Sequence, residues 1–398
     1  MSDQSPLRDT ISVMKSGARF DVAIIGAGVF GVWTAYQLRR AGAKTVLIDA
    51  YGPANSRASS GGESRIIRMG YGPDALYSKS SVRSLVLWKK FFESIGDDSL
   101  FKQTGVLWLA SEKDAYCEAT LATLDQVGVT FEKLTGSEIQ SRYPQFNFSD
   151  VEWGMLEPNS GALMARRAVQ AISSQTVKDG TTLLYDRVIA PTGKGRLEVL
   201  NTSGRATIFA ENFVFACGPW LAQLFPDILE GTIRVTRQEV YFFGTPAGDN
   251  RFGPDESPIW IDFNDLVYTF PNLENRGFKL AIDAHGPDFD PDSGDRVVTE
   301  AGMANARAVL QKRVPDLAAA PVIETRICQY ENTSNGDFLI DRHPHYDNVW
   351  LAGGGSGHGF KHGPAVAEYV QSMLSGTGIS EPRFSLATKH RMHQRKVF

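Results

Sequence analysis

The sequence predicts an α/β fold, α+β overall, in which a Rossmann-type parallel sheet is interleaved with an antiparallel sheet. Three observations predict it. Asp21–Ala50 has the pattern strand, glycine turn, helix and strand, which is a complete βαβ unit. Two later apolar runs, Asn212–Trp220 and Asn348–Gly359, also lead into glycine turns. Between them, residues 266–286 indicate two strands joined by a turn over Asn272–Gly277, which favours antiparallel pairing.

The parallel sheet is therefore expected to be assembled from segments that lie far apart in the sequence. We expect a discontinuous nucleotide-binding domain and a second domain that holds the antiparallel strands. The nucleotide-binding domain is predicted to comprise residues 1–100, 155–228 and 334–398. The second domain is predicted to comprise residues 101–154 and 229–333.

Gly26, Gly28 and Gly31 form a G-x-G-x-x-G pattern between the first strand and the helix. In such a unit the glycines give a tight turn, close approach of a pyrophosphate and close packing of helix on strand, and the helix N-terminus favours phosphate. Asp49 ends the second strand, where it is placed to accept from a ribose hydroxyl. A glycine turn alone would be weak evidence for a ligand site, but the strand, the helix and the acidic residue together predict a dinucleotide site. The pattern does not separate NAD from FAD.

Composition narrows the class of protein. The 398 residues include 42% hydrophobic residues, and 41 basic against 45 acidic residues give a net charge of −4 without a basic patch for nucleic acid or an anionic membrane. Cys117, Cys217 and Cys328 are odd in number and far apart, which argues against a disulfide framework or a metal site. Residues 1–20 lack a signal-peptide core, and no apolar run approaches about 18 residues. We expect a cytoplasmic monomer with a short N-terminal tail and a small-molecule substrate.

The loop after the second strand, Tyr51–Gly72, is rich in glycine and serine yet holds Arg57, Arg65 and Arg68. Composition alone is equally consistent with a solvated loop. Its SGGESRIIR, followed by YG, occurs together with ICQY before FLIDRHP and with GSGHGFK near the end. In this combination the chain, from about Phe20 to about Leu374, resembles the monomeric sarcosine oxidase branch of the D-amino acid oxidase-like flavoenzymes. That branch also holds N-methyltryptophan, pipecolate and fructosyl amino acid oxidases.

The resemblance implies FAD rather than NAD, and oxidation of a secondary amine that carries a carboxylate, with dioxygen reduced to hydrogen peroxide. It also implies a covalent bond between the flavin 8α-methyl group and Cys328 of ICQY, whereas a lone cysteine is otherwise most often a buried, inert thiol. Cys117 and Cys217 match no reactive position. The expected cofactor-binding residues are Gly26, Gly28, Val29, Phe30, Gly31, Asp49, Ser59, Gly62, Arg65, Cys328, Gly357, His358, Gly359, Phe360 and Lys361.

Lys361 closes the glycine-rich loop and precedes a predicted helix. The glycines let backbone N–H groups reach a flavin edge, and the positive end of the helix favours negative charge on the reduced ring. The alternative is a strand–helix connection that needs glycine for geometry alone. By resemblance, Lys361 binds the substrate carboxylate together with Arg68, whose planar fork suits bidentate contact. By the same resemblance Arg65 lies near the flavin.

Lys279 matches a lysine that lies beside the flavin and is associated with oxygen activation, where a positive charge would stabilise superoxide. Strand alternation puts it on the face opposite Phe278 and Leu280, and a lysine in that position is otherwise usually solvated. Tyr268 and Tyr330 match tyrosines that line the substrate pocket, although by pattern alone each is an ordinary strand aromatic.

The chain departs from the family pattern at two places. Ser60 and Gly61 stand where close relatives carry two histidines, and Asp283 stands where they carry a pocket histidine, with His285 two residues on. A roomier pocket with an added carboxylate would suit an amine larger than sarcosine.

Three other functions stay open from the sequence. An FAD-dependent dehydrogenase would pass its electrons to an acceptor other than oxygen. A non-catalytic flavoprotein subunit would belong to a larger complex. An NAD-dependent dehydrogenase is the weakest alternative, because it has no use for Cys328 or the GSGHGFK loop.

Overall fold

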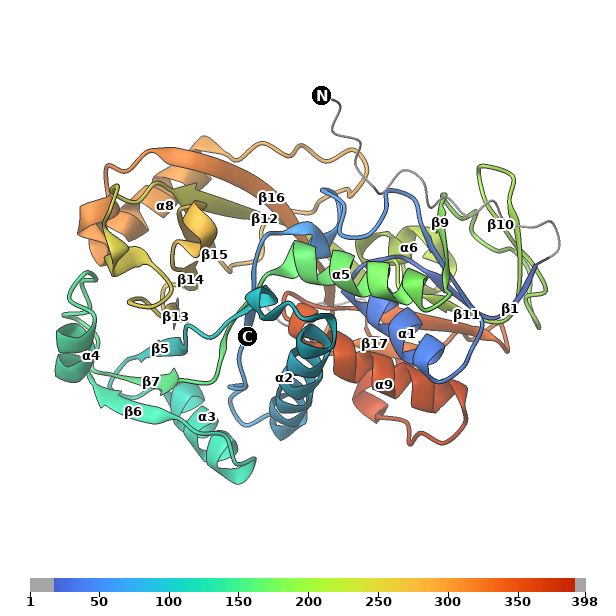
Figure 1. Cartoon of the computed structure of the whole chain (residues 1–398), viewed down its shortest axis with the longest axis horizontal. Coiled ribbons are helices and arrows are strands. Elements are labelled where there is room, and N and C mark those ends of the chain that lie inside the picture. Colours follow the sequence, from blue (N-terminus) through green and yellow to red (C-terminus); the bar gives the residue numbers. More distant parts are fainter. Residues whose placement is uncertain (1–17, 391–398) are drawn as a thin grey trace. The chain divides into compact units, whose positions relative to one another are not determined.

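The computed structural model describes residues 18–390, which divide into two compact units (Figure 1). The first comprises residues up to Gly62, Arg166–Val235, and residues from Tyr330 onward. The second comprises Glu63–Ala165 and Thr236–Gln329. The N-terminal tail that the sequence predicts lies, apart from its last residues, outside the described part of the chain.

The first unit is built on the predicted parallel sheet. Its strands, in spatial order, are β17 (Leu339–Arg342), β18 (Val349–Gly353), β11 (Thr207–Phe215), β1 (Arg19–Ile25), β2 (Thr45–Asp49) and β9 (Thr182–Tyr185). β17 runs antiparallel to β18, and β10 (Leu200–Asn201) pairs antiparallel with β11; the other neighbours are parallel. Because Ile25 lies opposite both Phe215 and Ile48, the carboxyl ends of these strands share one edge of the sheet. Distant segments therefore form this sheet, as the sequence predicts.

Helix α1 (Val29–Arg40) follows β1 and completes the predicted βαβ unit. It begins after Gly28, which is extended, and it ends where the N–H groups of Gly42 and Ala43 bond back to its last turn, with Gly42 at φ +94°. α1 packs against α9 (Gly363–Leu374), and the two helices lie side by side in Figure 1. The other helices of this unit are α5 (Ala165–Lys178, whose first residue belongs to the second unit), α6 (Leu221–Leu224) and α7 (Pro226–Leu229).

The second unit holds the predicted antiparallel strands. In spatial order its larger sheet comprises β16 (Val322–Thr333), β12 (Ile233–Phe243), β15 (Phe278–Ile282), β14 (Val267–Phe270), β13 (Ile259–Asp262), β5 (Val106–Ala110), β7 (Trp153–Glu157) and β6 (Glu132–Thr135). β14 and β15 are antiparallel, and the Asn272 side chain closes their turn by accepting from the Gly277 N–H at 2.7 Å. The hairpin prediction is confirmed.

The faces of β15 separate as predicted. Phe278 and Leu280 join the main apolar core of the unit, whereas Ala281 joins a small cluster with Cys328. Lys279, between Phe278 and Leu280, belongs to the Ala281 face by the two-residue period of a strand. Helix α8 (Glu300–Arg313) packs on the core side through Ala306 and Leu310.

Residues 63–100 and 155–165 belong to the second unit, whereas the sequence placed them in the first domain; residues 229–235 and 330–333 belong to the first unit, whereas the sequence placed them in the second domain. The first difference follows from packing: α2 (Ala75–Ile95) contacts α3 (Ala115–Gln126) and β7 pairs with β5, while β3 (Arg65–Ile67) and β4 (Phe101–Lys102) both pair with β8 (Gly161–Leu163). The short α4 (Gly136–Arg142) starts with a capping box between Thr135 and Glu138. The functions assigned to the two domains stay predictions.

The mixed α/β fold class is confirmed. Within residues 18–390, no helix combines the length and the apolar character that crossing a bilayer requires. The same part of the chain holds no group of three or more His, Cys, Asp or Glu side chains placed to bind a metal ion.

Candidate active site

The glycine turn after β1 passes directly against β11. Gly26 has φ +101°, and a Cβ there would lie 2.3 Å from the Ala216 carbonyl oxygen. A Cβ on Gly31 would lie 1.8 Å from the Gly26 carbonyl oxygen. Only glycine fits either position. Val29 and Phe30 then begin α1, so the helix N-terminus faces out from the carboxyl edge of the sheet.

Asp49 holds this turn together. Its Oδ2 accepts from the Ala27 N–H at 2.7 Å, and its Oδ1 accepts from the N–H groups of Tyr51 and Gly52, both at 2.8 Å. Burial raises the pKa of Asp49, and the three N–H contacts oppose that rise. A carboxylate offers about four acceptor positions, so one remains for the expected ribose hydroxyl.

Ser60, one of the departures from the family pattern, caps the N-terminus of α1. Its Oγ lies 3.0 Å from the Val29 nitrogen and accepts from that N–H, which no side chain at Gly28 can do. Ser59, Ser60 and Gly61 form a short 3-10 helix. Arg166 Nε donates to the Gly61 carbonyl, and the Arg166 N–H donates to that of Gly62.

The glycine-rich loop before α9 is folded onto itself. Gly357 has φ +80°, and a Cβ there would lie 2.8 Å from the Tyr330 ring. His358 stacks on Phe338 and lies 3.0 Å from the Gly336 carbonyl oxygen. Lys361 is only 4% exposed, and its Nζ donates to the His358 carbonyl at 3.1 Å. Gly359 and Phe360 sit between them, so the loop fixes a buried cation just before the helix.

Glu331, which the sequence did not single out, points into the same loop. Its Oε1 accepts from the Gly355 N–H at 3.1 Å, whereas its buried Oε2 has no hydrogen-bond partner among the described residues. Burial raises the pKa of Glu331 to about 7, against the opposing effect of the Gly355 and Gly354 N–H groups.

In the second unit, three of the predicted residues come together from three segments. Arg65 Nη2 lies 3.2 Å from Cys328 Sγ, and Arg65 Nη1 donates to the Ser64 carbonyl at 2.8 Å. Lys279 Nζ donates to the same carbonyl at 3.0 Å and lies 3.2 Å from Ser64 Oγ. Ser64 therefore ties the two cations together beside the thiol.

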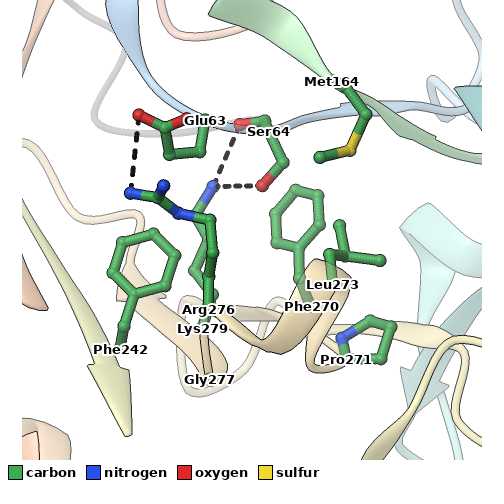
Figure 2. A pocket seen from close by; sticks show the side chains of 10 residues that line it. All are labelled: Glu63, Ser64, Met164, Phe242, Phe270, Pro271, Leu273, Arg276, Gly277 and Lys279. Atoms are coloured by element: carbon green, nitrogen blue, oxygen red, sulfur yellow. Dashed lines mark hydrogen bonds and ion pairs between the residues drawn. The ribbon is translucent and has the colours of Figure 1, made fainter. Parts of the chain in front are cut away.

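Lys279 is 2% exposed and lines the pocket shown in Figure 2. Its ammonium group lies 4.0 Å from the centre of the Phe270 ring. Burial first, and then the nearby Arg65 charge, hold the pKa of Lys279 well below its usual range. At another wall of the pocket, Arg276 forms an ion pair with Glu63 at 3.7 Å. Lys279 is therefore not the solvated strand lysine that was the alternative interpretation; its role beside a flavin stays a prediction.

Cys328 is 8% exposed and packs with Val240, Phe242, Ala281 and the partly buried Tyr268. Tyr268 thus packs against the cluster that contains the thiol. Asp283 directly follows β15, where its N–H donates to the Leu266 carbonyl at 2.6 Å. Asp283 and His285 are both partly exposed.

The other two cysteines keep their structural interpretation. Cys117 is buried in α3, and burial together with the Asp114 charge raises its pKa. Cys217 donates from Sγ to the Ile25 carbonyl at 3.4 Å, and burial followed by the Asp49 charge raises its pKa. Neither thiol is a ready nucleophile, because only the thiolate reacts.

Arg68 is 5% exposed inside an aromatic cage. Its guanidinium carbon lies 4.7 Å from the Tyr71 ring, 4.8 Å from the Trp108 ring and 5.9 Å from the Phe263 ring, and Nη1 donates to the Gly70 carbonyl. Arg68 belongs to the second unit and Lys361 to the first. Their joint contact with one carboxylate stays a prediction.

A buried carboxylate, Glu157, holds the segment that carries Arg68. Its Oε2 accepts from the Met69 N–H at 2.7 Å and from Ser160 Oγ at 2.7 Å. Its Oε1 accepts from the Gly70 N–H at 3.1 Å and from the Trp108 indole N–H at 2.9 Å. Glu157 therefore fixes both the backbone beside Arg68 and one wall of its cage.

The residues at the carboxyl edge of the parallel sheet fit a dinucleotide. The glycine turn admits close approach, α1 presents its N-terminus, and the unpartnered Oε2 of Glu331 is a buried polar atom of the kind that a ligand normally satisfies. The family model for FAD dependent oxidoreductases matches residues 21–373. The chain belongs to this family.

Relatives agree with this assignment. A monomeric sarcosine oxidase from Bacillus sp. (strain B-0618) is 30% identical, over 94% of this chain and 96% of that protein. Solved structures show the same fold: L-proline dehydrogenase from P. horikoshii superposes with a TM-score of 0.79, at 22% identity, over 92% of this chain and 97% of that one. A modified fructosyl peptide oxidase from Aspergillus nidulans superposes with a TM-score of 0.80, at 19% identity, over 92% and 93%.

Four residues at these sites were missed by the sequence reasoning: Ser60 as a helix cap, Ser64, Glu157 and Glu331. Ser64 stands inside the SGGESRIIR motif, and Glu157 is an acid at the end of an apolar strand, which is an available signal. Ser60 and Glu331 act on backbone groups far away in the sequence, which no local pattern shows.

We expect Glu157→Gln to destabilise the protein by about 1.5–3 kcal/mol, because the amide NH2 would face two donors that the carboxylate now accepts. The melting temperature should fall by several degrees, whereas Glu152→Gln, at an exposed carboxylate nearby, should melt like the wild type. An unchanged melting temperature for Glu157→Gln would remove Glu157 from its positioning role.

Proposed function

We propose that this protein is an FAD-dependent amine oxidase that oxidises the C–N bond of a secondary-amine amino acid, whether N-alkyl, cyclic or glycated. The observation that carries the proposal is the cluster of Arg65, Lys279 and Cys328 around Ser64. Two fixed cations and a thiol in a buried setting suit a redox centre on which negative charge develops. The FAD-dependent family supports the cofactor, and the name of the Bacillus relative supports the class of substrate.

When bound, FAD would accept a hydride equivalent from the carbon next to the amine nitrogen and pass both electrons to dioxygen, which gives hydrogen peroxide. In the first unit, the glycine turn, Asp49, and the N-terminus of α1 would hold the dinucleotide, together with the loop from Gly357 to Phe360. In the second unit, Arg65 would favour negative charge on the reduced ring. The oxidised substrate would leave as an imine, which water would hydrolyse after its release.

The protein's own cations would orient the substrate. Lys361 would bind the carboxylate as a point charge, and Arg68 as a planar fork held by its aromatic cage. Tyr268, Tyr330 and Asp283 would line the pocket around the amine. Free cysteines support a reducing, cytoplasmic setting, and the name of the Bacillus relative supports a monomer.

The function is tested by peroxide release across a panel of N-alkyl, cyclic and glycated amino acids, each beside the same amine without its carboxylate. We expect sarcosine to be a poor substrate, a bulkier secondary-amine acid to be a better one, and the decarboxylated amines to be rejected. Lys361→Met should raise KM for the acid roughly ten- to a hundredfold, because a charge-assisted contact in a partly dry site is lost.

The same panel separates the alternatives. Substrate-dependent reduction of the flavin without peroxide would show a dehydrogenase that uses another acceptor, and a flavin that no amine reduces would show a non-catalytic subunit. Efficient oxidation of the decarboxylated amines would remove Lys361 and Arg68 from carboxylate binding.

Covalent attachment is expected at Cys328. The Arg65 guanidinium lies 3.2 Å from the Cys328 sulfur, and this placement beside the proposed redox centre supports Cys328 as the residue that bonds to the flavin 8α-methyl group. Flavin should stay with the wild-type polypeptide after acid precipitation, and Cys328→Ser should release it. Cys117→Ser, at a buried thiol of α3, is the matched control and should keep its flavin. Full release from the wild type would make Cys328 a structural thiol.

Lys279 should act in reoxidation and only when protonated. Because its pKa lies well below the usual 10.5, the rate of reoxidation by oxygen should fall as pH rises, with an inflection well below that value. Stopped-flow half-reactions measure this rate apart from reduction by substrate.

Lys279→Met should lose that inflection and slow reoxidation far more than reduction, whereas Lys90→Met, at an exposed lysine of α2, should change neither step. Equal slowing of both half-reactions would exclude Lys279 from the oxygen step.

A further inference from the structure

Glu331 is a partly buried residue whose side chain carries a buried oxygen, Oε2, that the proposed chemistry does not use. Glu331 lies near the end of β16, directly after Tyr330, and shares a face of the strand with Thr333. Oε1 has its partner in the Gly355 N–H, whereas Oε2 is buried and has none among residues 18–390. A buried carboxyl oxygen without a partner costs stability, so its retention calls for a reason.

The surroundings of Glu331 locate it at the ligand edge of the parallel sheet. A Cβ on Gly353, which ends β18, would lie 3.3 Å from Oε2, and a Cβ on Gly218, just after β11, would lie 3.9 Å from it. A Cβ on Gly355 would lie 3.3 Å from Oε1. Open α/β sheets bind their ligands outside the carboxyl ends of such strands. The carboxyl group is therefore surrounded by backbone without side chains, on the side of the sheet where a dinucleotide belongs.

The other polar groups nearby do not need Glu331. Asp49 is occupied by three N–H groups, and the Cys217 thiol donates to the Ile25 carbonyl. Burial first, and then the Asp49 and Glu331 charges, raise the pKa of Cys217. Neither the Asp49 carboxyl group nor the Cys217 thiol therefore donates to Oε2.

We propose that Glu331 is a further FAD-binding residue, whose Oε2 forms a hydrogen bond with a hydroxyl group of the cofactor. A hydroxyl both donates and accepts, so it can pair with the carboxyl group in either protonation state. The inference rests on FAD as the cofactor and not on the substrate or the electron acceptor proposed above.

A ligand role and a structural role of Glu331 predict different melting temperatures for the protein without flavin. In the Cys328→Ser background, where FAD is expected to bind reversibly, Glu331→Met removes the unpartnered oxygen at similar side-chain length. Flavin-free Glu331→Met should melt within a few degrees of its parent, because removing an unpartnered carboxyl oxygen offsets the loss of the acceptor for the Gly355 N–H. Its affinity for FAD, titrated by flavin fluorescence, should fall about two- to tenfold.

Glu331→Gln keeps an oxygen for the Gly355 N–H and offers an amide NH2 in place of Oε2, so its affinity for FAD should stay within about twofold of the parent. Glu211→Met, at an exposed glutamate of β11, is the matched control and should change neither measurement. Undiminished FAD affinity in Glu331→Met would overturn the proposal. So would a flavin-free Glu331→Met that melts several degrees below its parent, because the carboxyl group would then serve the fold itself.

Discussion

The arrangement of Arg65, Lys279 and Cys328 in the second unit depends on the hydrogen bonds that the Ser64 carbonyl oxygen accepts. This oxygen accepts from Arg65 and from Lys279, two cations that would otherwise repel each other in a setting with little water. Holding both on one acceptor keeps Arg65 within 3.2 Å of the Cys328 sulfur and keeps Lys279 in its pocket. Burial first, and then the neighbouring Arg65 charge, lower the pKa of Lys279.

The first unit is constrained by backbone rather than by charge. Close contact between the turn at Gly26 and the end of β11 leaves no room for a Cβ, and Asp49 fixes the turn from the next strand. The helix N-terminus beyond it is a site for phosphate because its N–H groups are aligned, not because a cation stands there. Ser60 and Glu331 add side chains from distant segments to this backbone framework.

A carboxylate in each unit accepts hydrogen bonds from backbone N–H groups. Glu157 accepts four hydrogen bonds and ties the Arg68 segment to Trp108, so it acts as a positioning residue. Glu331 accepts from one backbone N–H and leaves an oxygen over, so it has binding capacity that the fold does not use. The number of donors around each acid, rather than its burial, distinguishes the two roles.

The sequence alone determined the βαβ unit, the hairpin over Asn272–Gly277 and the family, because turn chemistry, strand alternation and motif order are local and survive without coordinates. It also put Lys279 on the face opposite Phe278. Only the tertiary structure decided that Lys279 is buried and that its pKa is lowered. It also decided that segment 63–100 joins the second unit, and that Ser60 and Glu331 form hydrogen bonds with backbone groups far away in the sequence. Desolvation and pairing between distant strands depend on which segments meet in space, and no local pattern records that.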